Sequence, residues 1–124
     1  FLIQKHIVIL QYYNKGMGTT KTEHFTEKQS EIAIIAKAMG HPARVAIIDL
    51  LLKVNACIGN DILEKIPLAQ PTISQHLKVL KDANLIKGTI KGNTVCYCIN
   101  ESTFELLSKY FGNIASNVIH QDCC

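Results

Sequence analysis

"PTISQHLKVLKDANLIKGTIKGNTVCYCIN", residues 71–100, holds the two local patterns that decide the fold. In its first half, Ile73, Leu77 and Leu80 recur at intervals of four and three, which predicts a helix with one apolar face. Asn84 is a plausible end for that helix. The period then changes to two, and the residues KGN interrupt the alternation, which predicts a β-hairpin with lysines near its turn.

One helix is predicted upstream between Thr26 and Gly40. Thr26 and Gln29 have the spacing of a capping box, in which each side chain bonds to the backbone of the other residue. Ile32 and Ile35 then fall at helical intervals, and the glycine suits the C-terminal end.

Two more helices are predicted before residue 71. Pro42 suits the first turn of the second helix. Four apolar residues give that helix a broad face and predict that it is largely buried: Val45, Ile48, Leu51 and Leu52. A short third helix follows, with Asn60 as its expected cap, and PLAQ at residues 67–70 breaks it.

A last helix is predicted over residues 102–120, with an apolar seam. Its members step by three, four, three and four: Phe104, Leu107, Phe111, Ile114 and Val118. This spacing is typical of a coiled coil, and further apolar residues lie beside it. We expect a homodimer in which the seam and the first helix, through Ile32 and Ile35, meet the partner. A wide core helix of a monomer is the alternative.

These elements predict a mainly α fold with a small β-hairpin wing, in the order α-α-α-α-β-β-α. A chain of 124 residues fits one domain, and 48% hydrophobic residues make disorder improbable. We assign residues 26–120 to a winged helix-turn-helix domain and residues 121–124 to a cysteine-containing tail. Residues 1–25 are expected to be an extension without assigned function; a natural start at Met17 and an additional helix or strand before it both stay open.

The excess positive charge lies on the predicted helix and hairpin. Between residues 71 and 93, four lysines face the single acid Asp82, and this balance equals the net charge of +3 of the whole chain. A neutral body with a basic module indicates a polyanionic partner, although a solvated lysine-rich face would give the same count.

The helix that begins near residue 71 suits the major groove of double-stranded DNA, because its N-terminal face is polar. Gln75 can pair with an adenine edge, and the hairpin lysines can reach phosphates. The expected DNA-binding residues are Gln70, Thr72, Ser74, Gln75, His76, Lys78, Lys81, Lys87, Lys91 and Asn93.

Three segments resemble the ArsR/SmtB family of winged helix-turn-helix repressors: HPARVAIIDLLL (41–52), LAQPTISQHLKVLKDANLI (68–86) and GNTVCYCIN (92–100). The resemblance extends from about residue 32 to the end. It implies a homodimer built on the first and last helices, which binds an operator near a promoter and leaves it when an effector arrives. No cofactor is expected for DNA binding.

The five cysteines are an odd number, and no signal peptide is recognisable, so we expect a reduced, cytoplasmic protein. The apolar start is too short to span a bilayer, and no membrane association is expected. The candidate ligands for a thiophilic ion such as As(III) are Cys57, Cys96, Cys98, Cys123 and Cys124.

The resemblance implies such an ion because members of the family often sense thiophilic metals or metalloids. Cys57 matches the first thiol of the arsenic-sensing Cys-x-Cys pattern, but Gly59 stands in place of the second. The zinc-sensing pattern is disfavoured, because the last helix offers only His120 and Asp122 at its end. We expect a site that joins Cys57 to the tail pair or to one hairpin cysteine.

Other functions stay open or are excluded. The thiols also fit a redox or persulfide switch, and a winged helix can bind protein instead of DNA. Filler cysteines without a ligand remain the plainest alternative. An enzyme is not expected, because the sequence has no paired-carboxylate motif, no glycine-rich phosphate loop and no Cys–His arrangement with a supporting acid.

Overall fold

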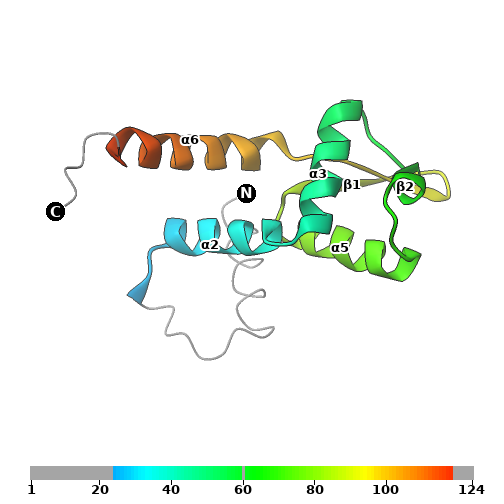
Figure 1. Cartoon of the computed structure of the whole chain (residues 1–124), viewed down its shortest axis with the longest axis horizontal. Coiled ribbons are helices and arrows are strands. Elements are labelled where there is room, and N and C mark those ends of the chain that lie inside the picture. The colour runs from blue at the N-terminus through cyan, green and yellow to red at the C-terminus, as the bar shows by residue number, and fades with distance from the viewer. Residues whose placement is uncertain (1–23, 60, 119–124) are drawn as a thin grey trace.

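The computed structural model describes residues 24–59 and 61–118 (Figure 1). The elements are α2 (Glu27–Met39), α3 (Pro42–Val54), α4 (Asp61–Lys65), α5 (Gln70–Asp82), β1 (Ile86–Lys91), β2 (Thr94–Ile99) and α6 (Glu101–Val118). The predicted order of four helices, a hairpin and a helix is confirmed. The expected cap Asn60, the tail 121–124 and nearly all of the extension 1–25 lie outside the described residues.

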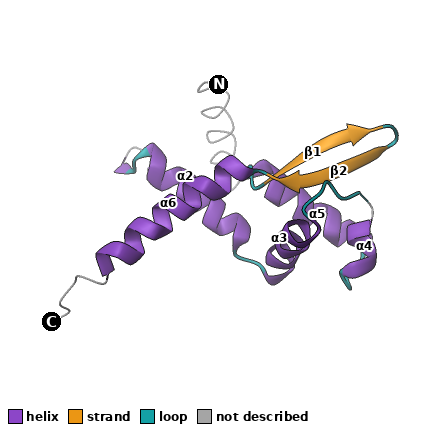
Figure 2. Cartoon of the chain, turned by 90° about the horizontal axis from the view of Figure 1, so that it is seen from above, coloured by secondary structure: helices purple, strands orange, loops and turns teal. Residues whose placement is uncertain are grey.

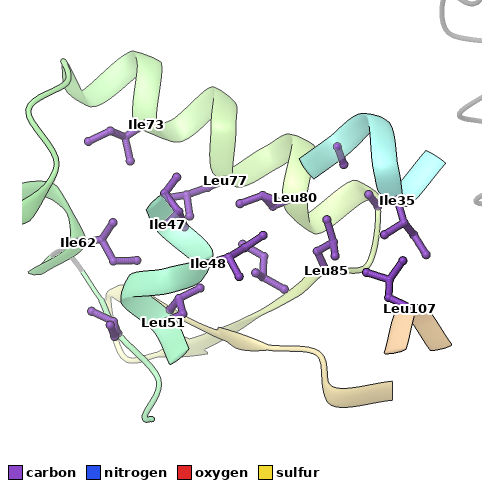
Figure 3. Packing of buried hydrophobic residues seen from close by; sticks show 14 of the residues in the cluster. Ile35, Ile47, Ile48, Leu51, Ile62, Ile73, Leu77, Leu80, Leu85 and Leu107 are labelled. Atoms are coloured by element: carbon purple, nitrogen blue, oxygen red, sulfur yellow. The ribbon is translucent and has the colours of Figure 1, made fainter. Parts of the chain in front are cut away.

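The core lies between α3 and α5, and Figure 3 shows its side chains meeting there. From α5, Ile73, Leu77 and Leu80 point inward, as the spacing predicts. From α3, Ile47, Ile48 and Leu51 face them. Ile73 and Leu80 are fully buried, and truncating such a side chain to alanine typically costs about 2–5 kcal/mol of stability.

The prediction of the buried face of α3 is wrong for two residues. Val45 and Leu52 keep 39% and 55% of their surface exposed, whereas Ile47 is fully buried. Successive helical residues are rotated by about 100°. A helix whose inward direction is set by residues 47, 48 and 51 must therefore turn residues 45 and 52 outward.

Side-chain hydrogen bonds cap the N-termini of α2 and α3. Thr26 Oγ1 accepts a hydrogen bond from the backbone N–H of Gln29 at 3.1 Å, and Gln29 Oε1 accepts one from the N–H of Thr26 at 2.9 Å, so the capping box is confirmed. Pro42 lies in the first turn of α3, and His41 Nδ1 accepts the N–H of Ala43 at 3.1 Å.

Asn84 turns the chain from α5 into the wing. Its φ of 58° is left-handed, a conformation that asparagine tolerates better than most residues. The N–H of Asn84 donates to Lys81 O and that of Leu85 donates to Leu80 O, both at 3.0 Å. These two bonds are a Schellman motif, which confirms the predicted end of the helix.

The wing is the antiparallel pair β1–β2, in register from Ile86 opposite Ile99 to Lys91 opposite Thr94. Gly92, with φ of 62°, opens its two-residue turn. The outer edge of β2 makes one further bridge, to Ile58 in the segment that precedes α4 (Figure 2). The wing is therefore attached to the helical body through this segment as well as through β1.

The last helix is anchored only at its N-terminal half. Thr103 Oγ1 donates to Asn84 O at 2.7 Å, and Leu107 is buried in the core. Beyond residue 110, every described residue of α6 is exposed, and that half projects away from the wing (Figure 2). Among the described residues, no helix is both long and apolar enough to cross a bilayer.

Candidate nucleic-acid interface

The direction of each α5 side chain follows from the buried stripe of that helix. Because successive residues are rotated by about 100°, Gln75 and Lys78 lie opposite the stripe. Ser74 and Lys81 lie on one flank, and His76 lies on the other. The polar residues thus occupy the part of α5 that is free of core contacts.

The structure leaves nearly all of the predicted DNA contacts accessible. His76 is half-buried, and the other nine are exposed: Gln70, Thr72, Ser74, Gln75, Lys78, Lys81, Lys87, Lys91 and Asn93. No lysine among them forms an ion pair with a carboxylate in the described part of the chain. Their charge is therefore available to a polyanion.

The α5 helix and the wing form one continuous surface beside Lys81. A Cβ atom at Gly88 of β1 would lie 3.3 Å from Lys81 Nζ and 3.5 Å from Tyr97 Cε1. The lysine side chain therefore extends over the strand at the one position that lacks a side chain of its own. This contact places the end of the Lys81 side chain against the wing.

His76 does not have a free ring, because it contacts two residues at the start of α3. Its ring centroid lies 4.5 Å from that of His41, and its Nδ1 lies 3.4 Å from Arg44 Nη1. Arg44 is a donor only, so Nδ1 accepts this bond and Nε2 remains as the donor atom. The predicted hydrogen bond from His76 to DNA must therefore be donated by Nε2.

The sequence patterns did not identify Arg44 as a residue of this interface, because it is a single cation in an apolar segment. Its Nε donates to Ala38 O, and its Nη2 donates to Lys37 O at 3.4 Å. These carbonyls belong to the last turn of α2, where cations are favoured. Arg44 therefore links the end of α2, the start of α3 and the flank of α5.

The pKa of His76 is lowered below its ordinary value of 6.5. Partial burial is the largest cause, followed by the positive charges of His41 and Arg44. His76 is therefore mainly neutral at neutral pH, which agrees with Nδ1 as an acceptor.

The residues expected at the dimer contact divide into two groups. Ile32, Ile35 and Leu107 are buried within the chain itself and leave little surface for a partner. Phe104 is half-buried against the same core. Phe111, Ile114 and Val118 are 54%, 41% and 61% exposed on one side of α6. An apolar surface of this kind is typical of an interface.

The structure brings two of the candidate thiols together. Cys57 precedes Ile58, which bridges to Tyr97, and this places Cys57 beside Cys98 of β2. Cys96 is half-buried on the same strand, while Cys123 and Cys124 lie outside the described residues. Within the described ranges, no group of three or more Cys, His, Asp or Glu residues is arranged to hold a metal ion.

The chain is similar in sequence to known bacterial regulatory proteins. The profile of the family described as "Bacterial regulatory protein, arsR family" matches residues 41–87, which run from the start of α3 to β1. The arsenical resistance operon repressor of Staphylococcus xylosus is 32% identical over 93 residues, which cover 75% of this chain and 86% of that protein.

One further curated protein is similar in sequence, and one solved structure is similar in fold. The transcriptional repressor SdpR of Bacillus subtilis is 35% identical over 71 residues, 57% of this chain and 78% of that protein. The ArsR-like transcriptional regulator from Rhodococcus sp. RHA1 has a similar fold, with a TM-score of 0.65 at 17% identity, over 74% of this chain and 86% of that one.

The depressed pKa of His76 predicts a loss of stability in acid. As the pH falls below about 6.5, the unfolded chain takes up this proton before the folded chain does, so folding is opposed. We expect the free energy of unfolding, measured in urea, to fall more between pH 7 and pH 5 for the wild type than for His76→Gln. Equal losses in the two proteins would contradict this assignment.

Proposed function

Because this chain belongs to the ArsR family, whose members are DNA-binding transcriptional regulators and not enzymes, we propose that it is a homodimeric, cytoplasmic repressor of specific operators. One observation carries this proposal. The apolar face of α5 is buried on α3, and the opposite face presents polar and basic side chains with no partner inside the described chain.

In the proposed complex, the N-terminal half of α5 enters the major groove. Gln75 lies at the centre of the exposed face, where its amide can make two hydrogen bonds to an adenine edge. Thr72 and Ser74 contact bases or phosphates nearby. Because α5 continues into the wing beside Lys81, the hairpin lies over the adjacent minor groove, with Lys87 and Lys91 near its phosphates.

The proposed dimer uses the exposed apolar surface of α6. Exposure of Phe111, Ile114 and Val118 to water is unfavourable. A second copy of the chain that covers them lowers the free energy. In the proposed dimer, the two-fold axis passes through this surface with both copies of α5 on the same side of the dimer. Operators should then contain two inverted half-sites about 10 base pairs apart.

We further propose that a thiophilic ion of the As(III) type releases the operator. The arsenical resistance repressors among the relatives support this chemistry. Two neighbouring thiols, Cys57 and Cys98, are present in the described chain, and a third ligand would have to come from Cys123 or Cys124 in the tail. Release requires only that the ion bind the DNA-free form more tightly than the DNA-bound form.

Two variants should distinguish the effects of base contacts from those of phosphate contacts on binding. Gln75→Ala should lose about 1–3 kcal/mol of preference for the cognate operator over a mismatched one. Lys91→Ala should weaken binding to all sequences alike and reduce the slope of log affinity against log salt by about 1. Both effects are measured by gel shift or fluorescence anisotropy at several salt concentrations.

Lys109→Ala is the matched control for the lysine variant, since Lys109 is also exposed but pairs with Glu105 on α6, away from α5. Its salt slope should equal that of the wild type. A wild-type affinity that does not change with salt would favour a protein partner over DNA and would contradict the proposal.

The dimer surface is tested by Phe111→Glu. Burying an unpaired carboxylate in an apolar contact is costly, so sedimentation equilibrium should give a monomer mass where the wild type gives a dimer. Operator affinity should fall with it. Asn113→Glu adds the same charge to another face of α6 and should remain dimeric; loss of the dimer in both variants, or in neither, would rule out this surface.

The effector is tested by titrating As(III), Cd(II) and Zn(II) separately into the complex of protein and operator. At least one soft ion should lower the affinity, and Cys57→Ser should abolish the response, because it removes one of the neighbouring thiols. If no ion changes the DNA affinity of the wild type, the ion-sensing part of the proposal fails while the DNA-binding part stands.

A further inference from the structure

The Ile58–Tyr97 bridge determines which thiols face each other. Ile58 and Tyr97 exchange both backbone hydrogen bonds, each at 2.9 Å. In an antiparallel pair, the residues next to such a pair stand directly opposite one another without backbone bonds of their own, and their Cα atoms are only about 4.5 Å apart. Cys57 and Cys98 occupy this position, where side chains approach most closely.

The two thiols also interact. The pKa of Cys98 is raised, and a hydrogen-bonding interaction with the Cys57 thiol is the largest cause, ahead of burial and of the charge of Cys57. Lys87, which pairs with Cys98 across the hairpin, opposes this shift. A Cα separation of about 4.4–6.8 Å is the range that a disulfide requires, so the pair can be joined with little backbone movement.

The neighbouring thiol Cys96 is placed differently. It lies two residues before Cys98 on β2, and the same antiparallel register sets Gly59 opposite it. On its other side, across the hairpin, its partner is Thr89. Cys96 therefore has no thiol directly across from it, although it shares the strand and the half-buried environment of Cys98.

We propose that Cys57 and Cys98 are an oxidation site, which forms a reversible disulfide between the segment before α4 and the wing and thereby lowers operator affinity. The effect on affinity rests on the proposed DNA-binding function, but formation of the bond does not. The site uses two thiols and needs neither the tail cysteines nor a bound ion.

A peroxide is the oxidant. The exposed Cys57 reacts first: its thiolate sulfur attacks one peroxide oxygen, the O–O bond breaks, and the leaving hydroxide takes a proton to become water. The Cys98 sulfur then attacks the sulfenic sulfur of Cys57, the S–O bond breaks, and the second water leaves with the Cys98 proton. Two thiols thus lose two electrons and two protons, and hydrogen peroxide becomes two molecules of water.

The bond acts on DNA binding because it ties the wing to the segment that leads into α4 and α5. The segment before α4 leads into α4, the short helix that precedes α5, and the wing carries Lys87 and Lys91. Formation of the covalent bond between the two sulfurs pulls this segment toward β2. The wing and α5 then lose the freedom to adjust together to the two grooves.

The experiment uses the full chain with Cys123→Ser and Cys124→Ser, which removes the tail thiols from competition. The reduced protein is treated with hydrogen peroxide and alkylated, its non-reduced peptides are mapped by mass spectrometry, and its operator affinity is measured. We expect a cross-link between residues 57 and 98, a loss of two hydrogens in mass and at least a fivefold fall in affinity. Dithiothreitol should reverse all three.

Matched variants assign the effect. Cys96→Ser should form the cross-link and lose affinity like its parent, whereas Cys57→Ser, Cys57→Ala and Cys98→Ser should do neither. A cross-link through Cys96, a bond only between two chains, or a 57–98 bond that leaves affinity unchanged would overturn the proposal. If the reduced protein binds no duplex at low salt, the proposed function fails, and peptide mapping still decides whether the site is oxidised.

Discussion

The packing of α5 on α3 is the constraint on which the rest of the structure depends. Ile73, Leu77 and Leu80 cannot leave the core without a cost of several kcal/mol. Their burial fixes the rotation of the helix and therefore turns Gln75 and Lys78 to solvent. The proposed DNA-facing side of α5 is thus a consequence of which side is apolar, and the polar residues need no contacts of their own to hold it there.

The same packing positions the wing. The Schellman motif at Asn84 ends α5 and sends the chain directly into β1, and the bond from Thr103 to Asn84 O fastens α6 to this turn. Ile58 holds the other edge of the hairpin. The α5 helix, the wing and the segment before α4 are therefore connected to one another, and a chemical change at Cys57 and Cys98 is transmitted to the proposed interface.

Local chemistry made the element order predictable from sequence, as at the capping box of Thr26 and the helix end at Asn84. What depended on contacts distant in sequence was not predictable. The apolar periodicity predicted that Val45 is buried on α3. Packing against α5 buries Ile47 instead and leaves Val45 exposed. Arg44 reaches His76 across two elements, and Cys57 meets Cys98 through a single bridge that no periodicity reveals.

The central claim is that two copies of α5 read duplex DNA from a two-fold dimer. Selection of bound duplexes from a random pool by the reduced wild-type chain tests it most directly. The account predicts enrichment of an inverted repeat whose half-sites are centred about 10 base pairs apart. Recovery of a single half-site, of direct repeats, or of no enriched sequence at low salt would contradict it.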